Sequence, residues 1–315
     1  MKLKEITSGS FNAAEWEAKG YELPKFDIAA VAKKTHDEPT WVHFGAGNIF
    51  RAFPAAILND ALNSGKYDRG VIVAESFDYE IIDKAYRPYD NLSLLVSLQS
   101  TGTIEKKVIA SVTESLKADY QFADDWARLV EIFRQPSLQM VTFTITEKGY
   151  SVAPADLERG LKPVFAMGKL AVLMLARYQA GQLPITLQST DNCSHNGDKV
   201  KAGVQAYARK WVEQELVPAD FLGYLQDSTK VTYPWSMIDK ITHVRTRRFR
   251  PCLLPMASRT TRPSSPSATP TPLPSSMPKR CSTSLWRTTT PTVVHRSNSE
   301  VHSTPPARLS IRSRP

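Results

Sequence analysis

The sequence has few cysteines, no long apolar run and no sign of a secretory leader. Its three cysteines, Cys193, Cys252 and Cys281, form an odd set without metal-like spacing, which argues against a disulfide framework and against a zinc site. No stretch of eighteen consecutive apolar residues is present, and the amino terminus does not resemble a signal peptide. We therefore expect a soluble, cytoplasmic protein that has no metal ion and no membrane partner.

Most of the chain also lacks an excess of basic charge, although the whole sequence has a net charge of +9. Residues 243–315 carry 13 of the 40 Lys and Arg but only one acid, Glu300, which leaves 27 basic and 30 acidic residues in 1–242. The part expected to fold therefore offers no basic surface that could follow a phosphate backbone. For this reason the sequence disfavours binding of nucleic acid.

Residues 243–315 contain no glycine and 12 prolines, together with many Ser and Thr. Their basic residues are twelve arginines and one lysine, whereas residues 1–242 have nineteen lysines and eight arginines. So abrupt a change resembles translation in a shifted reading frame; the alternatives are a natural basic tail that binds nucleic acid non-specifically and a targeting segment. The segment lacks the apolar periodicity that would offset its ordering entropy, so we predict that it is disordered.

The stretch Thr40–Arg51, TWVHFGAGNIFR, predicts the entry to a dinucleotide-binding βαβ unit. An apolar strand ends at the turn Gly45–Gly47, and a helical pattern follows over about residues 48–63. Glycine permits a tight turn and a close approach of the backbone to a pyrophosphate, which the start of the next helix also attracts. Phe50 replaces the third glycine of a full fingerprint, so an ordinary strand–helix turn is the alternative.

The run Gly70–Glu75, GVIVAE, predicts a second buried strand with an acid at its end. In a dinucleotide fold such an acid binds the adenosine ribose, and Glu75 and Asp78 are the candidates. Both follow Gly45 by about thirty residues, later than the usual spacing of about twenty. Either carboxylate would repel the 2′-phosphate of NADP, which favours NAD; a solvated loop acid is the alternative interpretation.

The rest of residues 40–242 alternates predicted strands with predicted helices. Strands are predicted at 92–99, 105–112, 139–145 and 183–189, the first two as a hairpin, and helices at 81–89, 119–133, 156–182, 199–216 and 219–226. This order predicts an α/β fold with a Rossmann-like, mainly parallel sheet and helices on both faces. The expected regions are an arm at 1–39 with a short helix near 13–19, a dinucleotide-binding domain at 40–242 and a disordered tail at 243–315.

The polar stretch TDNCSHNG, residues 190–197, follows the strand predicted at 183–189. Asn192 is therefore expected at the carboxyl end of a strand, where open α/β sheets bind ligands. An amide N–H directed at a ketone oxygen would stabilise the charge that develops there during hydride transfer. The alternative is that Asp191, Asn192 and Asn196 are loop and helix-capping residues.

Two charged residues, Glu147 and Lys148, follow the strand predicted at 139–145. They can line the cofactor site, and an exposed ion pair is the alternative interpretation. His195 by itself is interpreted as a loop residue.

Four stretches, in this order, resemble the successive signatures of the long-chain mannitol dehydrogenase family. They are FGAGNIFRAF at 44–53, TEKGY at 146–150, STDNCSHNG at 189–197 and YPWSMIDKIT at 233–242. The family includes mannitol dehydrogenases and the reductases of fructuronate and tagaturonate. The resemblance implies a metal-free, NAD-dependent oxidoreductase in which a hydride passes between a secondary carbinol carbon and nicotinamide C4. The implied substrate is a small sugar acid or polyol, with mannonate and fructuronate preferred over mannitol and fructose.

The resemblance also implies the roles of particular residues. The expected cofactor-binding set, which includes the acid and the lysine considered above, is Phe44, Gly45, Ala46, Gly47, Asn48, Arg51, Glu75 and Lys148. Asn192 matches the asparagine that polarises the reacting oxygen, and Asp239 matches an acid in the segment that closes the substrate side. These two residues form the expected catalytic set, and no metal ligand is expected.

One signature of the family is missing from this sequence. In the family, a general acid/base lysine with the arrangement K-x(4)-N-x(2)-H lies beyond the position of Thr242, at the start of a mainly helical substrate domain. Lys279 is the only lysine after that point, and no Asn or His follows it at those offsets. The substrate domain is therefore expected to be absent. Two functions remain open: an oxidoreductase with impaired turnover, and an NAD-binding remnant that turns nothing over.

Overall fold

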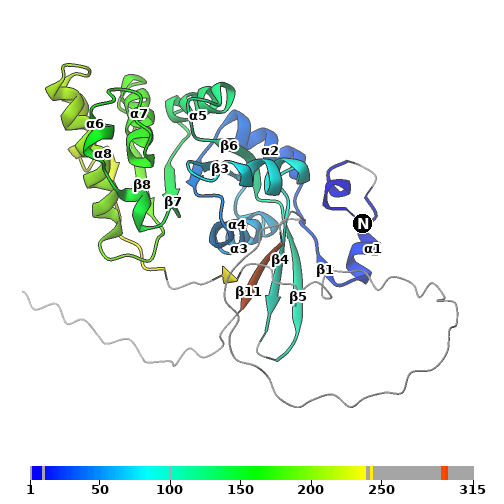
Figure 1. Ribbon diagram of the computed structural model, residues 1–315. Coiled ribbons are helices and arrows are strands. Elements are labelled where there is room, and N and C mark those ends of the chain that lie inside the picture. Colours follow the sequence, from blue (N-terminus) through cyan, green and yellow to red (C-terminus); the bar gives the residue numbers. More distant parts are fainter. Residues whose placement is uncertain (1, 9–10, 100, 239–241, 244–291, 297–315) are drawn as a thin grey trace, which may run out of the picture.

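Strand β2, Trp41–Phe44, lies inside a six-stranded parallel sheet in this computed structural model, which describes residues 2–8, 11–99, 101–238, 242–243 and 292–296 (Figure 1). The sheet order is β6-β3-β2-β7-β8-β9, with β3 at Val71–Glu75, β6 at Val112–Lys117, β7 at Met140–Phe143, β8 at Ile185–Ser189 and β9 at Val231–Thr232. Counted along the chain, this order is 3-2-1-4-5-6, which is the order of the dinucleotide-binding Rossmann fold. The order reverses between β2 and β7, so ligands are expected at the carboxyl ends of these two strands.

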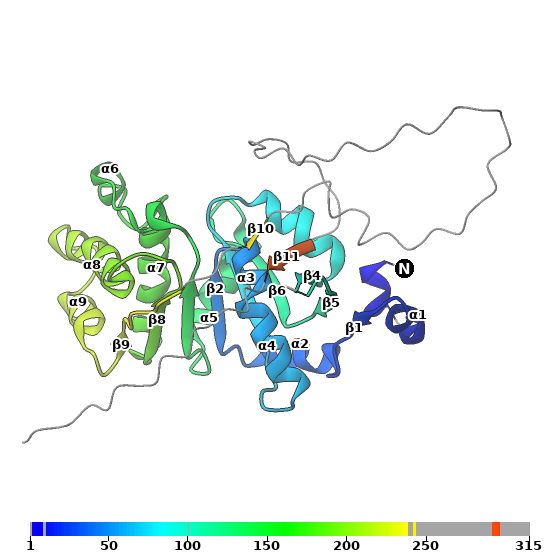
Figure 2. The same ribbon diagram turned by 90° about the horizontal axis from the view of Figure 1, so that it is seen from below.

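Helices cover both faces of this sheet, as predicted (Figure 2). One face packs against α2 (Ile28–Asp37), α3 (Asn48–Ala52) and α4 (Pro54–Asn63), and the other against α5 (Ala123–Arg134), α7 (Ala166–Gln179), α8 (Asn196–Glu213) and α9 (Ala219–Gln226). Along β3, Val71 and Val73 join the first core while Ile72 and Ala74 join the second. Because successive side chains point to opposite faces, the sequence of a strand that is covered on both faces is continuously apolar.

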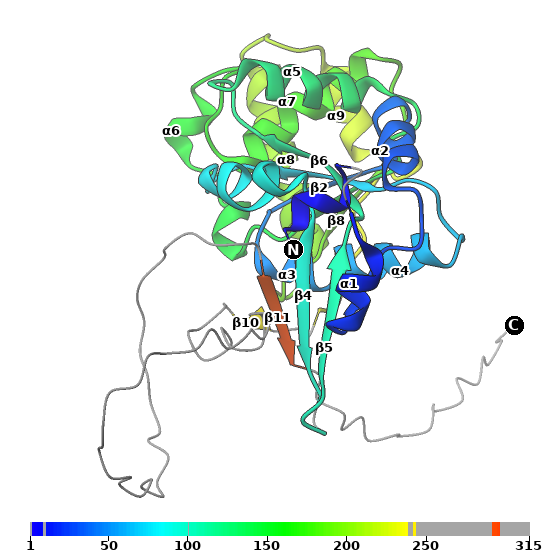
Figure 3. The ribbon, with the colours of Figure 1, turned by 90° about the vertical axis from the view of Figure 1, so that its right-hand side faces the viewer.

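A second sheet contains the predicted hairpin. Its order is β1-β5-β4-β11-β10, with β1 at Tyr21–Glu22, β5 at Ile104–Ile109, β4 at Ser93–Leu98, β11 at Thr292–Arg296 and β10 at Thr242–His243. Strands β4 and β5 pair antiparallel and extend away from the helices of the main sheet (Figure 3). The strand predicted at 105–112 is wrong at its end, because β5 stops at Ile109 and β6 begins at Val112 in the other sheet. Strand β6 was not predicted because its sequence is polar. Its Glu114 forms an ion pair with Arg128 at 2.9 Å.

Two short parts of the predicted tail, His243 and residues 292–296, are described, and both lie in strands. Strand β11 pairs parallel with β4 and antiparallel with β10. The edge of β4 presents backbone N–H and C=O groups that any extended segment can pair with, whatever its side chains. The rest of the tail prediction, for residues 244–291 and 297–315, lies outside the described residues.

The helix predicted over residues 48–63 is two helices, α3 and α4. They meet at Phe53, whose φ and ψ of −124° and −74° are not helical. The next residue, Pro54, has no N–H to donate to a preceding carbonyl, and proline disfavours a helical conformation at the residue before it. The helix that follows the glycine turn is therefore only five residues long.

The helix predicted over 156–182 is also divided, into α6 (Pro154–Leu157) and α7. The Asp156 carboxylate accepts hydrogen bonds from the N–H groups of Val164 and Phe165 at 2.8 and 3.1 Å, which holds the intervening loop against α6. These bonds satisfy backbone donors at the start of α7 that a continuous helix would have paired internally.

The remaining elements are short. They are η1 (Leu3–Ile6), α1 (Ala13–Ala18), the π-helical turn η2 (Ile82–Tyr86), and the 3₁₀ turns η3 (Arg87–Tyr89) and η4 (Glu147–Tyr150). Helix α1 confirms the short helix expected in the arm. Among the described residues, no helix combines the length and the apolar character needed to cross a membrane.

Candidate functional site

The turn after β2 passes directly over the end of β7. Gly45 has a φ of +109°, and a Cβ atom added to it would lie 2.2 Å from the carbonyl oxygen of Thr144, so only glycine fits. A Cβ atom added to Gly47 would meet nothing within 4 Å. The first glycine therefore allows two strands to approach each other, whereas the second leaves open space in front of the turn.

Phe44 and Ala46 belong to the same stretch but point into the core. They are 2% and 0% exposed, and the Phe44 ring stacks on Phe143 with ring centroids 5.6 Å apart. The N–H of Ala46 donates to Glu75 and its carbonyl oxygen accepts the Tyr86 hydroxyl. Neither side chain is therefore available to a ligand, although both residues were expected in the cofactor-binding set.

Arg51, on α3, is buried beside the glycine turn with most of its donors unpaired. Its Nη2 donates to Asn48 Oδ1 at 2.5 Å, while Nε and Nη1 have no hydrogen-bond partner. The guanidinium lies over the ring of Tyr86, 5.6 Å from its centroid, and burial lowers the pKa of the group. A buried charge with unpaired donors is costly unless something pairs with it. Arg51 therefore has the character of an anion-binding group.

Glu75, the acid at the end of β3, is buried and fully engaged by backbone donors. Its Oε2 accepts the N–H of Ala46 at 2.8 Å, and its Oε1 accepts the N–H groups of residues 76–78 at 2.9 to 3.3 Å. The carboxylate thus fixes the turn after β3 and joins it to the glycine turn. Of the two predicted ribose-binding acids, Asp78 is the one with an exposed side chain.

Asn192 lies at the rim of a cavity of about 420 Å³ at the carboxyl end of β8. The cavity is lined by Asn192, Cys193, Ser194, His195, Asn196, Trp235, Ser236 and Met237. The ring of His195 stacks on Trp235 with centroids 4.3 Å apart, and its backbone is left-handed, with φ of 52°. The structure thus brings the predicted Asn192 together with the segment 233–238.

Asp191, next to Asn192, ties the loop after β7 to the end of β8. Its carboxylate accepts the N–H groups of Ile145 and Thr146 at 2.9 and 3.2 Å and the hydroxyl of Tyr150 at 2.6 Å. Burial and the Asp191 carboxylate raise the pKa of Tyr150, so its hydroxyl stays a donor. These bonds hold Thr146 at φ of 62°, an uncommon conformation for a β-branched residue.

Asn196 joins the same loop to the segment 233–238. Its side-chain N–H₂ donates to the carbonyl oxygens of Asp191 and Ser236, and its Oδ1 accepts the N–H of Ser236 at 3.0 Å. At Gly197, a Cβ atom would lie 2.4 Å from the carbonyl oxygen of Tyr233. Asp191 and Asn196 therefore make loop-ordering contacts, as the alternative interpretation expects.

The structure does not bring the other predicted residues, Lys148, Glu147 and Asp239, together with Asn192. Lys148 is exposed on η4, and Glu147 forms an ion pair with Lys199 instead of with Lys148. Asp239, the second expected catalytic residue, lies outside the described residues. Within the described part of the chain, no group of three or more His, Cys, Asp or Glu side chains could hold a metal ion.

Sequence reasoning missed three contributors to the site: Tyr150, Trp235 and Ser236. Tyr150 and Ser236 hold the loops by hydrogen bonds, and Trp235 supplies an exposed aromatic wall. All three occur in the stretches TEKGY and YPWSMIDKIT, so the signal was present in the sequence, but the partner of each residue is distant along the chain.

Comparisons with known proteins show which proteins this chain is similar to. A model of the mannitol dehydrogenase Rossmann domain matches residues 39–253. The D-mannonate oxidoreductase of Thermotoga maritima is 48% identical over 239 residues, which cover 72% of this chain and 44% of that protein. The mannitol 2-dehydrogenase of Cereibacter sphaeroides is 29% identical over 242 residues, which cover 70% of this chain and 45% of that protein.

Two solved structures share the fold. One is the Pseudomonas fluorescens mannitol 2-dehydrogenase in a ternary complex with NAD and D-mannitol, with a TM-score of 0.64, 23% identity and coverage of 80% of this chain and 49% of that one. The other is a substrate-free D-sorbitol dehydrogenase, with a TM-score of 0.62, 23% identity and coverage of 79% and 49%. The chain therefore spans about half the length of the relatives that it matches.

Proposed function

Because the chain belongs to the mannitol dehydrogenase family, whose Rossmann-domain model matches residues 39–253, we propose that it binds NAD at the turn Gly45–Gly47. The observation that carries this proposal is the pair of unpartnered donors, Nε and Nη1, on the buried Arg51 beside that turn. A pyrophosphate is a charged acceptor that would pair these two buried nitrogens once the side chain turns towards the open space in front of Gly47. The residues present therefore fit a dinucleotide.

NAD, when bound, would exchange a hydride with the carbinol carbon of a sugar acid or polyol. In this chain, Arg51 and Asn48 would hold the phosphates, and Asn192 would donate an amide N–H to the reacting oxygen. Lys148 and Asp239 are proposed on the cofactor side and the substrate side respectively. We propose mannonate and fructuronate ahead of mannitol and fructose, which the identity to a D-mannonate oxidoreductase supports.

Turnover is proposed to be impaired in this chain, because the lysine signature of the family is missing from its sequence. Proton transfer by a positioned side chain contributes about two to four decades of rate. NAD binding without turnover is the second candidate function.

Titration of the purified chain with NADH, followed by fluorescence, tests the proposal. We expect saturable binding, and we expect R51M to weaken it by about tenfold or more, because a hydrogen bond to a charged group contributes about 1.5–3 kcal/mol. Arg134, exposed near the end of α5, provides the matched control R134M, which should bind NADH as the unchanged chain does.

A parallel assay mixes fructuronate or fructose with NADH and follows absorbance. Binding without turnover would support the second candidate function, and turnover would show that another residue replaces the missing lysine. Absence of NADH binding by the unchanged chain would refute the cofactor proposal itself.

A further inference from the structure

Phe77 is the most unusual side chain near the proposed cofactor site, because its large apolar ring is 91% exposed. It lies two residues beyond the end of β3, at the carboxyl edge of the sheet. Exposed single apolar residues are common on protein surfaces and carry no argument by themselves. The backbone of the turn that carries this ring, however, is fixed by two separate sets of polar contacts.

The first support is Glu75, whose Oε1 accepts the N–H of Phe77 itself at 2.9 Å. The same carboxylate binds the N–H of Ala46 through Oε2, so the Phe77 turn has a fixed position relative to the glycine turn. The ring is therefore presented on a backbone that is tied to the proposed pyrophosphate site.

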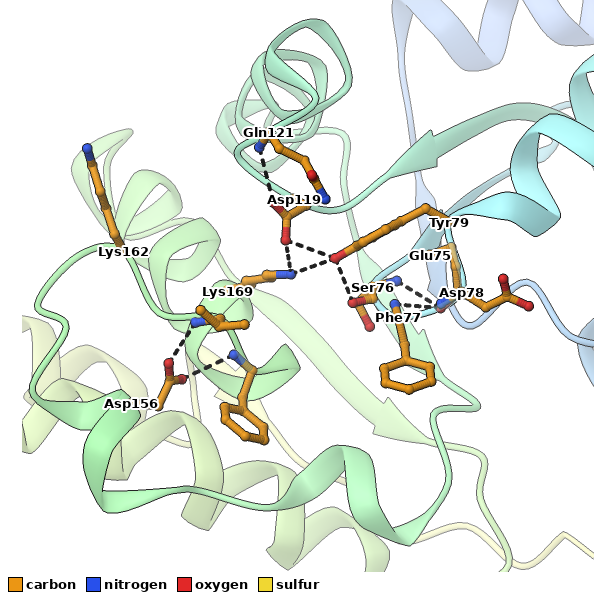
Figure 4. A network of polar contacts seen from close by, with 12 residues as sticks. Glu75, Ser76, Phe77, Asp78, Tyr79, Asp119, Gln121, Asp156, Lys162 and Lys169 are labelled. Atoms are coloured by element: carbon orange, nitrogen blue, oxygen red, sulfur yellow. Dashed lines mark hydrogen bonds and ion pairs between the residues drawn. The ribbon is translucent and has the colours of Figure 1, made fainter.

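The second support is a buried polar network formed by Lys169, Asp119 and Tyr79, called here the Lys169 network (Figure 4). Lys169 Nζ, whose side chain is 1% exposed, donates to Asp119 Oδ2 at 2.5 Å and to the Tyr79 hydroxyl at 2.9 Å. The Tyr79 hydroxyl lies 2.8 Å from Asp119 Oδ2 and 2.9 Å from the carbonyl oxygen of Ser76, so it can donate to either. The network thus joins α7 and the loop after β6 to the turn that carries Phe77.

Burying this network is costly, because an ammonium group loses its hydration and must be paired. Burial raises the pKa of Asp119, but hydrogen bonds from Lys169, from the Gln121 N–H and from Tyr79 hold it below its ordinary value. Asp119 is therefore ionised at neutral pH and pairs with Lys169. A charged pair at this position is well suited to fixing one conformation of the turn.

We propose that the ring of Phe77 is the platform on which the adenine base of the dinucleotide stacks, and that the Lys169 network positions this platform. In a fold with this strand order, the turn after the second strand receives the adenosine ribose, so the base lies beside the same turn. A fixed aromatic ring gives a flat base a contact of about 1–3 kcal/mol, as in other base–aromatic stacks. The inference rests on the proposed function, because it requires an adenine dinucleotide.

The test compares ligands that have or lack the adenine base. Binding of NADH, ADP-ribose and reduced nicotinamide mononucleotide is measured for the unchanged chain, F77S, F77W and I57S. Ile57 is 55% exposed on α4 and provides the matched control for loss of a surface apolar side chain. We expect F77S to weaken NADH and ADP-ribose by about tenfold, corresponding to about 1.4 kcal/mol, with no effect on the mononucleotide. F77W should bind as tightly as the unchanged chain.

The Lys169 network is tested through Y79F, which removes the hydroxyl and keeps the ring. If the network acts by positioning Phe77, Y79F should weaken ADP-ribose by about threefold in the unchanged chain and have no further effect when combined with F77S. A general loosening of the fold would instead weaken all three ligands in both backgrounds, and that result would overturn the positioning role.

The outcomes separate this inference from the proposed function. If the unchanged chain binds NADH, and F77S binds both NADH and ADP-ribose as tightly as the unchanged chain does, the platform is refuted and the cofactor proposal stands. Loss of mononucleotide binding in F77S would also refute the platform. If the unchanged chain binds none of the three ligands, both proposals fail together.

Discussion

Two buried arginines, Arg51 and Arg177, show how the two edges of the main sheet differ. Their exposed fractions are 6% and 0%, and burial lowers the pKa of both guanidinium groups. Arg177, on α7, uses every donor: it binds the carbonyl oxygens of Phe133, Gln135, Leu138, Leu183 and Pro184 at 2.7 to 3.1 Å. Arg51 binds one side-chain oxygen, and two of its nitrogens have no partner.

The difference in hydrogen bonding between Arg177 and Arg51 follows from the backbone groups that surround each of them. Arg177 lies where the loops after α5 and α7 enter β7 and β8, and it satisfies carbonyl groups that these loops leave without partners. Arg51 lies at the carboxyl edge, where the same kind of side chain keeps donors free. Equal burial with unequal satisfaction thus distinguishes Arg177, a structural arginine, from Arg51, which we propose binds a ligand.

The largest effect is expected from R177M. The substitution removes a donor from five carbonyl oxygens, but Leu183 keeps the Tyr224 hydroxyl at 2.7 Å and Gln135 keeps the Leu138 N–H at 3.4 Å. The other three lose their donor, and an unsatisfied buried group costs about 1–3 kcal/mol, so we expect a loss of at least about 3 kcal/mol in the free energy of unfolding. Urea unfolding followed by circular dichroism measures it, with R134M as the control. A loss below about 1 kcal/mol would show that water replaces the guanidinium and that the comparison of the two edges is wrong.

His43, on β2, is a third buried basic side chain, and it is accommodated by staying neutral. It is 0% exposed, its ring nitrogens contact the hydroxyls of Thr142 and Thr144 at 2.6 and 2.9 Å, and burial lowers its pKa to about 3. Below pH 6.5 the unfolded chain binds a proton that the folded chain excludes. Stability is therefore lost as the pH falls from 6.5 towards 3.

At pH 5 this linkage amounts to about 2 kcal/mol relative to pH 7. We expect H43F to remove that part of the pH dependence, because phenylalanine cannot be protonated. Urea unfolding of both proteins at pH 7, 6 and 5 provides the measurement. Parallel pH profiles for the two proteins would mean that His43 accepts its proton in the folded state.

Much of the fold could be predicted because its signals are local. The strand at 41–44 and the glycine turn after it are encoded in adjacent residues, as is the apolar run of β3. Strand β6 was not recognised, because its charged side chains pair with distant residues such as Arg128. The break between α6 and α7 was missed for the same reason, since it depends on a side-chain cap and not on apolar periodicity.

The site was less predictable than the fold. The sequence indicates the turn Gly45–Gly47 and Asn192, but the partners of Glu75 are backbone groups, which no residue pattern reveals. Which acid is exposed and which arginine is unsatisfied are properties of the three-dimensional arrangement alone.

The smallest effect, and the one of opposite sign, is expected from R51M. Methionine has a helix propensity close to that of arginine, and it removes a buried charge whose Nε and Nη1 have no partner. We therefore expect the ligand-free variant to gain about 1 kcal/mol in stability, a rise in Tm of about 2–4 °C. Thermal unfolding with and without NADH checks both parts, because NADH should raise the Tm of the unchanged chain more than that of the variant. A large loss of stability in R51M would instead make Arg51 a second structural arginine, and its unpartnered donors would no longer indicate a missing ligand.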